Sequence, residues 1–221
     1  MIRRLPIVVA VVLVLGAAAA CGTTSGGSSA ATGSAPGSTG AATTTVPSGP
    51  LTGATAPPTL LGGSGPLAKT RVYAGLSRNH VDGPIRYRQT PPVGGDHNPV
   101  WQTCGYYSSP VNTPNGVHSL EHGAVWITYR PGLPAPQQAV LRAIVTDHPY
   151  VLITPWADGS LPSPVVLSAW GVQLDAPSAT SPAVAAFVRE FERGPQTPEQ
   201  GVPCAGGVGS PDVQSRAPAG N

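Results

Sequence analysis

Apolar residues follow two periods in the second half of the chain. Residues 124–130 and 150–154 are β-branched and aromatic runs typical of buried strands. Residues 136–147, between them, place apolar side chains at helical spacing on one face. Residues 164–174 form another apolar run, which a Trp-Gly pair interrupts. The pattern predicts a strand, a helix, and then two further strand segments.

A last helix follows, and its start is marked by Ser181 and Pro182. Serine is a favoured N-cap, and proline is favoured at the first helical position. The helix is predicted to continue to about Arg193, and its inward residues are Val184, Phe187, Val188 and Phe191. The order of elements predicts an α+β domain: a small mixed β-sheet with two helices on one face. Its first two strands, joined by a helix, are expected to be parallel.

The N-terminal half of this domain is predicted to be long and rich in loops. Proline and glycine punctuate residues 71–115, and only residues 85–87 suggest a short strand. Residues 91–101 contain three prolines and a Gly-Gly pair, so they cannot form a helix. A loop of this length in a compact domain is usually functional.

Composition divides the 221 residues into four parts. Residues 22–68 carry no charge and consist mainly of Gly, Ser, Thr, Ala and Pro, a composition that cannot bury enough apolar surface to fold. The predicted parts are a signal peptide (1–20), a lipidated cysteine with a flexible linker (21–68), a globular domain (69–204) and a disordered tail (205–221).

The first residues indicate export. Arg3 and Arg4 precede an apolar segment that ends in four alanines before Cys21. This pattern is typical of a bacterial signal peptide with a lipobox, in which the cysteine receives the lipid. We therefore expect a lipid-anchored protein on the extracytoplasmic face of the cell membrane, with the membrane as its partner. A plain secreted protein and an uncleaved membrane anchor are the alternatives.

Charge and cysteine count refine this picture. The net charge is +2 without a dense basic stripe, which argues against nucleic acid as a partner and points to no particular protein partner. The three cysteines are Cys21, Cys104 and Cys204. If Cys21 carries lipid, the other two remain as a pair that can oxidise outside the cytoplasm. The alternative is that Cys104 is a metal ligand beside His97.

Histidines supply the candidate chemistry. His118 and His122 are four residues apart on a predicted helical turn, so their side chains share one side. Glu121 is adjacent, and His97 lies on the Gly-Gly loop. Three imidazoles suit zinc or copper. Asp96 is expected to fix the tautomer of one histidine.

Several readings of this cluster stay open. The His-x-x-Glu-His spacing matches an inverted zinc-protease motif. That motif belongs in a long helix, however, whereas Gly123 and a strand follow at once. Two alternatives to simple metal binding are a non-enzymatic envelope interaction domain with structural histidines and a metal-dependent hydrolase with Glu121 as its base. Trp101 and Trp170 are the expected walls of the site.

Several motifs together resemble a known family. They lie at residues 80–87, 91–98, 101–105, 118–123, 168–171 and 194–199. Over about residues 71–207 the chain resembles an uncharacterised bacterial family, domain of unknown function 3105, common in actinobacteria. The resemblance adds His80 to the candidate ligands because it lies in a family motif. The family has no established activity, so no reaction follows from it.

Overall fold

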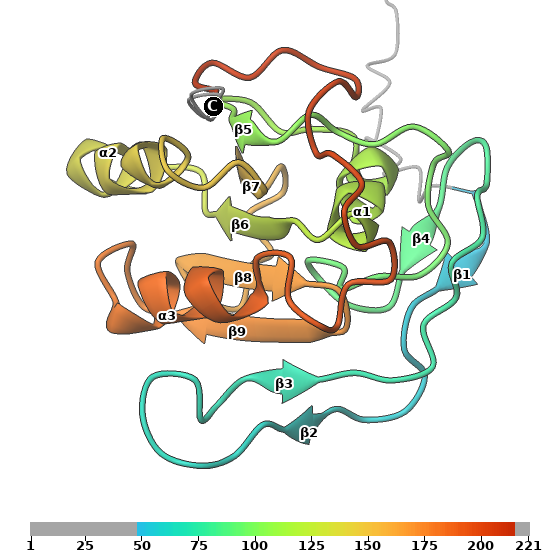
Figure 1. Cartoon of the computed structure of the whole chain (residues 1–221), viewed down its shortest axis with the longest axis horizontal. Helices are drawn as coiled ribbons and strands as arrows, with labels where there is room; N and C mark the ends of the chain where they lie inside the picture. The colour runs from blue at the N-terminus through green and yellow to red at the C-terminus, as the bar shows by residue number, and fades with distance from the viewer. Residues whose placement is uncertain (1–47, 215–221) are drawn as a thin grey trace, which may run out of the picture. The chain divides into compact units, whose positions relative to one another are not determined.

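A seven-stranded mixed sheet forms the centre of the structure, a computed structural model that describes residues 48–214. In Figure 1 its strands follow one another from β5 at the top to β2 at the bottom. In spatial order they are β2 (Thr59–Leu60), β3 (Arg71–Val72), β9 (Val172–Ala176), β8 (Val165–Ala169), β6 (Val125–Tyr129), β7 (Val151–Pro155) and β5 (Gly105–Tyr106). A second sheet pairs β1 (Leu51–Thr52) with β4 (Arg86–Tyr87).

The pairing of the long strands follows from their connections. Strands β6 and β7 are parallel and are joined by α2 (Ala135–Ile144), which confirms the predicted parallel pair. Strand β8 is antiparallel to both β6 and β9. The turn between β8 and β9 contains Trp170 and Gly171, and Gly171 has a φ of +71°. The predicted α+β class with a mixed sheet is confirmed.

The third helix, α3 (Pro182–Phe191), shows how local sequence sets an element. The Ser181 side chain accepts a hydrogen bond from the Ala183 amide, as an N-cap residue should. The four residues predicted to point inward, Val184, Phe187, Val188 and Phe191, are all buried. Together with residues of α2 they pack against the sheet as one apolar core.

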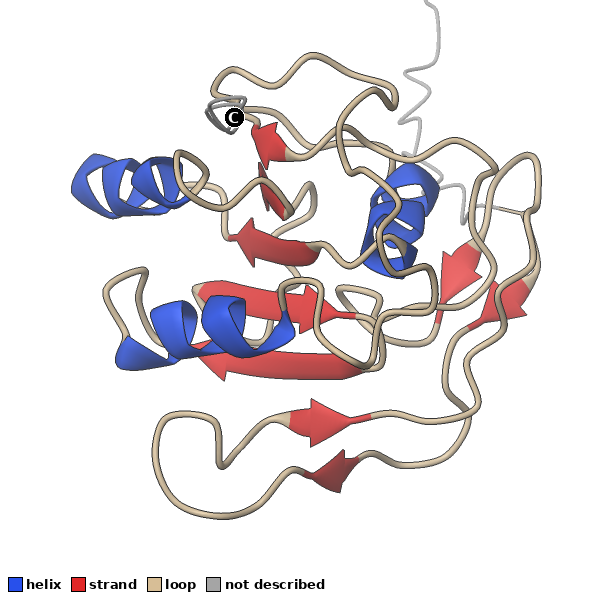
Figure 2. Ribbon diagram, in the orientation of Figure 1, coloured by secondary structure: helices blue, strands red, loops and turns tan. Residues whose placement is uncertain are grey.

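The opposite face of the sheet carries a helix that the sequence only hints at. Helix α1 (Thr113–Glu121) packs Val117 and Leu120 against Trp126 and Leu152 of the sheet. Figure 2 shows that the part of the molecule around α1 consists mainly of loops. The two predicted helices, α2 and α3, lie on one face as expected, and the described residues contain a third helix, α1, which covers the other face.

The ends of the ordered domain also differ from the prediction. Within the predicted linker, residues 51–52 and 59–60 form strands β1 and β2. Within the predicted tail, Val208 pairs with Gln102, and Val213 pairs with Tyr106. These segments order because their backbone groups bond to strands and loops already in place, which composition alone does not reveal.

Other predictions lie outside the described residues. These include the signal peptide, the lipidated Cys21 and the linker up to residue 47. Across residues 48–214, no helix has the length and apolar character needed to cross a membrane.

Candidate metal centre

Helix α1 brings two histidines to one side of the sheet. His118 lies in its last turn, and His122 is its C-cap residue, so the rings are 4.6 Å apart between centroids. Gly123 then ends the helix with a φ of +100°, a conformation that favours glycine. The sequence predicts one turn from Val117, whereas the helix begins at Thr113.

Close packing fixes the position of α1. At Gly116, a Cβ atom would lie 2.8 Å from the Trp126 ring, so only glycine lets the helix approach the sheet this closely. The histidine side of α1 is thereby held over the sheet rather than in solvent. His118 is 3% exposed and His122 is 2% exposed.

Two extended segments bring the remaining histidines to α1. His80 and His97 form a parallel β-bridge, in which the His97 amide donates to the Asn79 carbonyl at 3.0 Å. The His118 ring centroid lies 4.9 Å from that of His80 and 4.8 Å from that of His97. His97 is fully buried, whereas His80 is exposed. Histidines far apart in the chain thus form one cluster.

Backbone carbonyls orient the three buried rings. The Nδ1 atoms of His97, His118 and His122 lie 2.8, 2.7 and 3.0 Å from the carbonyl oxygens of Gly95, Asn98 and Pro203, in that order. A carbonyl only accepts, so each Nδ1 must carry the proton and donate it. In the neutral ring, Nε2 then keeps its lone pair, the state in which histidine binds a metal.

Glu121 faces one of these free nitrogens. Its Oε2 atom lies 2.8 Å from His97 Nε2, and both side chains are almost completely buried. His97 Nε2 has no hydrogen-bond partner of good geometry within residues 48–214, and its contact with Glu121 is an ion pair only when the ring is protonated. With the proton on Nδ1, two lone pairs face each other here. That contact is favourable only with a cation or an additional proton beside it.

The site holds its groups in the protonation states that a metal needs. Burial lowers the pKa of His118 to about 4, and the neighbouring imidazoles add to this effect against the opposing bond to Asn98. Burial also lowers the pKa of His122. For Glu121, burial acts to raise the pKa, but the direct contact with His97 and the charge of nearby groups such as Arg78 hold the pKa below its usual value. At neutral pH the site therefore presents His118 and His122 as neutral imidazoles and Glu121 as a carboxylate.

The potential ligand atoms fall into two overlapping groups, each with its atoms within 4.8 Å of one another. The first contains His80, His97, His118 and Glu121, and the second contains His118, His122 and Glu199. All five residues predicted from the sequence are thus brought together around His118. The sequence reading did not include Glu199, although it closes the last of the family motifs.

Tertiary pairing positions Glu199. Its backbone amide donates to the Glu121 carbonyl at 3.0 Å, which fixes it beside the end of α1. Its Oε2 atom lies 3.5 Å from His122 Nε2, and its side chain is 41% exposed. The second group therefore has an edge open to solvent.

The structure contradicts one predicted role, that of Asp96, and one alternative, that of Cys104 as a ligand. The Asp96 carboxylate accepts from the Asn79 amide at 2.9 Å and orients no histidine, a task that backbone carbonyls perform instead. Cys104 is not a metal ligand, because it forms a disulfide with Cys204, with Cα atoms 5.4 Å apart. That disulfide confirms the predicted pairing.

The disulfide also supports the site. The Cys104 amide also donates a hydrogen bond to the Cys204 carbonyl at 3.0 Å. The disulfide and this hydrogen bond together hold the segment around Cys204 beside Cys104. Pro203, whose carbonyl orients His122, immediately precedes Cys204. The bridge therefore fixes one of the three groups that set the ring orientations.

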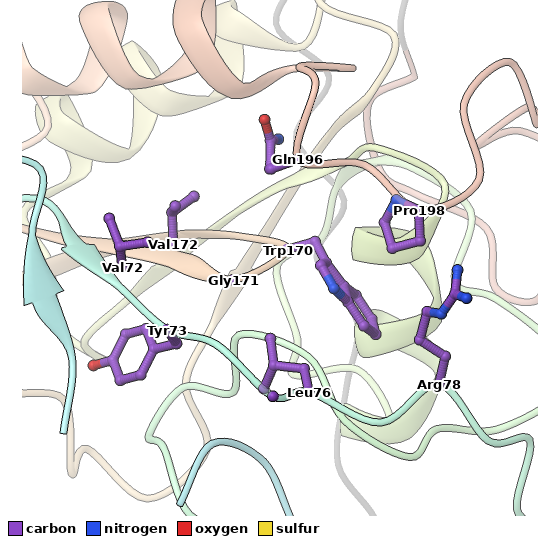
Figure 3. Close-up of a pocket in the computed structure, with 10 residues that line it drawn as sticks. Val72, Tyr73, Leu76, Arg78, Trp170, Gly171, Val172, Gln196 and Pro198 are labelled. Carbon is purple, nitrogen blue, oxygen red and sulfur yellow. The ribbon is translucent and has the colours of Figure 1, made fainter. Parts of the chain in front are cut away.

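The predicted tryptophan walls lie where expected. The Trp101 ring is 4.8 Å from His122 and 5.9 Å from His118 between centroids, and the Trp170 ring is perpendicular to His97 with centroids 6.0 Å apart. Trp170 also lines a cavity of about 430 Å³. Figure 3 shows apolar side chains along this cavity and Arg78 at one end. The cavity adjoins the cluster through Trp170, but no histidine lines it.

Comparison with known proteins identifies the family. Residues 80–206 match the family described as protein of unknown function (DUF3105). No curated protein matches the chain, and no solved structure matches it. The matched region contains every side chain of the two ligand groups and both bridged cysteines. Because the match covers more than half of the chain, the protein belongs to the DUF3105 family.

Proposed function

We propose that this protein binds a transition-metal ion, zinc or copper, at the cell envelope. The observation that carries the proposal is the orientation of three buried imidazoles, each donating Nδ1–H to a backbone carbonyl. Their free Nε2 atoms lie among the carboxylates of Glu121 and Glu199. Metal-binding histidines commonly have their second nitrogen held in this way.

The energetics favour a ligand over a purely structural role. A buried polar atom without a partner costs on the order of 1–3 kcal/mol. A neutral His97 that only braced the fold would use both nitrogens, but its Nε2 has no hydrogen-bond partner of good geometry in the described part of the chain and meets the Glu121 carboxylate at 2.8 Å. A cation beside it would bind both this nitrogen and the Glu121 carboxylate, which removes the cost.

The donor set narrows the choice of ion. Imidazole nitrogens with a carboxylate oxygen suit zinc and copper. The one disulfide of the described chain takes up Cys104 and Cys204, so thiolates do not enter the set. The contact of Glu121 with His97 favours a role for this carboxylate as a ligand. In a hydrolase that used Glu121 as its base, this carboxylate would have to stay unbound to the metal ion.

The location forms part of the same proposal. A disulfide persists in oxidising compartments, which supports an extracytoplasmic domain. Cys21, after the apolar N-terminal segment, would carry the lipid. Detergent phase partitioning of cell extracts tests this: the natural chain should enter the detergent phase, and Cys21→Ala should not. A natural chain found only in the aqueous phase contradicts the anchor.

Metal binding is tested by equilibrium dialysis of the full chain against zinc and, separately, copper(II), followed by elemental analysis. The natural chain should retain metal, and His118→Ala should lose most of it because His118 belongs to both groups. His148→Ala is the matched control, since His148 pairs with Glu192 outside the cluster. Retention of no metal by the natural chain, or equal retention by His118→Ala, contradicts the proposal.

A further inference from the structure

His118 is the ligand that both groups share, and it has only one nitrogen to offer. Its Nδ1 atom is bonded to the Asn98 carbonyl, so only Nε2 can bind an ion. The two groups can be filled together only if one of them does without His118, and the first group can do so because it still keeps three ligands, whereas the second would keep two. The first then keeps His80, His97 and Glu121, and the second keeps His118, His122 and Glu199. Each becomes a set of two imidazoles and one carboxylate.

We infer that the centre holds two metal ions at once, one in each of these sets. The inference rests on the proposed metal-binding function and extends it to a two-metal site. Two histidines and one carboxylate form a known coordination unit that leaves further positions on the ion open. Water or an oxygen-containing anion takes such positions in two-metal sites.

The second set is prepared for an ion as well as the first. The Pro203 carbonyl accepts the proton of His122 Nδ1, and His122 Nε2 is directed toward Glu199 at 3.5 Å from its Oε2. The Trp101 ring lies 4.8 Å from the His122 ring between centroids. The imidazole is thus shielded and oriented while its ligating nitrogen stays free of other partners.

The two sets are connected through the backbone of their carboxylates. The Glu199 amide donates to the carbonyl of Glu121, so the two acidic residues are joined directly. Each set also contains one solvent-accessible ligand: His80 is exposed, and Glu199 is partly exposed. Each position therefore has its own contact with solvent, through which an ion can enter without displacing the other.

Charge predicts what the filled centre attracts. The two carboxylates only partly offset the charge of two divalent ions, so the filled centre carries excess positive charge. The excess favours an anion, such as hydroxide or phosphate, at the open coordination positions. Binding of inorganic phosphate should thus be stronger to the two-ion form than to the metal-free chain.

The test is a zinc titration of the full chain in a non-chelating buffer, with bound metal measured by elemental analysis after dialysis. The natural chain should saturate at two zinc ions. Glu199→Gln and His97→Ala should each saturate at one. Glu190→Gln is the matched control, because Glu190 is exposed on α3 and belongs to neither set. Circular dichroism checks that each variant folds. Because the Glu199 side chain is partly exposed, Glu199→Gln is expected to disturb folding less than His97→Ala.

The outcomes separate this inference from the function on which it rests. If the natural chain saturates at one zinc ion and Glu199→Gln binds the same amount, the second metal position is overturned but the proposed metal binding is not. One zinc whose affinity falls equally in Glu199→Gln and His97→Ala also overturns it, because a single shared ion then uses both sets. No zinc in the natural chain contradicts the proposed function itself.

Discussion

Both faces of the seven-stranded sheet are buried, but only the α1 face adds a cluster of buried titratable side chains to its apolar residues. Beneath α2 and α3 the fully buried side chains are mostly hydrocarbons, including Ile127, Leu141 and Phe187. Beside α1 the buried side chains include His97 at 0% exposure and Glu121 at 2%. The two faces therefore contribute differently to the free energy of folding. Burial of apolar side chains stabilises the fold, whereas burial of polar side chains without full hydrogen bonding destabilises it.

The difference indicates which face stabilises the protein and which performs its function. The α2/α3 face needs no ligand to be stable. The α1 face depends on a disulfide, on backbone carbonyls that orient its histidines, and, in our account, on metal ions. Perturbations of the two faces should therefore have separate effects on stability and on metal binding.

The largest expected effect is loss of the disulfide on the α1 face. The bridge joins residues 100 apart in sequence, and a loop of that length corresponds to about 4.7 kcal/mol in the chain-entropy model. Replacement of both cysteines by serine should lower the free energy of unfolding by most of this amount in urea denaturation. Hydrogen exchange should accelerate in residues 199–204 before it does in β6 and β8. Uniform acceleration would contradict the separation of the two faces.

A large truncation on the other face should act on stability alone. Phe187→Ala removes a fully buried ring and should lower the free energy of unfolding by about 3–5 kcal/mol. Zinc bound per folded chain should stay the same, because Phe187 contacts the apolar core and not the cluster. Measurement combines urea denaturation with dialysis. A loss of zinc in the folded fraction would show that the faces are coupled.

Zinc should stabilise the natural chain through the α1 face. An ion present at a hundredfold excess over its dissociation constant adds about 2.7 kcal/mol for one site. Differential scanning calorimetry should show a higher melting temperature with zinc and reversal by a chelator. His118→Ala should show little of this increase, whereas Phe187→Ala should show all of it. An equal increase in both variants would place the ion elsewhere.

Acid should weaken the metal-free α1 face within a defined window. Because His118 has a pKa of about 4 when folded and 6.5 as its ordinary value, the unfolded chain binds the proton more readily. Stability is then complete above pH 6.5, falls as the pH drops toward 4, and levels off below. The loss is on the order of 2 kcal/mol after a discount for nearby solvent. His118→Asn should flatten this slope, and a slope that it leaves unchanged would exclude His118 as its source.

The smallest effect on stability is expected for His148, which belongs to neither apolar cluster and not to the histidine cluster. His148 Nδ1 lies 2.7 Å from Glu192, and the His148 side chain is 36% exposed. Such a pair contributes about 0.2–1 kcal/mol, so His148→Ala should change stability only slightly. Zinc content should not change at all. A loss of zinc there would mean that general histidine content, rather than the cluster, determines binding.

The same contrast explains what the sequence could predict. Strands β6 and β7 and helices α2 and α3 show their period within a few neighbouring residues, so the α2/α3 face was predicted closely. The two-residue strands β2, β3 and β5 have no period of their own and exist because a partner strand is present. The start of α1 was missed because it contains Pro114 and Gly116, and the reason for Gly116 is its contact with Trp126.

The candidate site was predicted in part for similar reasons. His118, His122 and Glu121 share a helical turn, which local spacing reveals. Glu199 reaches them through a backbone hydrogen bond across the fold, which no local pattern encodes. Asp96 was assigned an orienting role that carbonyls perform, and every residue has a carbonyl, so the sequence could not show which ones act.

The central claim is that the free Nε2 atoms of the cluster bind metal ions. Crystals of the zinc-loaded full chain, with diffraction recorded on both sides of the zinc absorption edge, test it most directly. We predict two anomalous peaks, one at bonding distance from His97 Nε2 and one from His122 Nε2. Zinc peaks confined to other parts of the molecule, with the three Nε2 atoms bonded only to protein or water, would contradict the account.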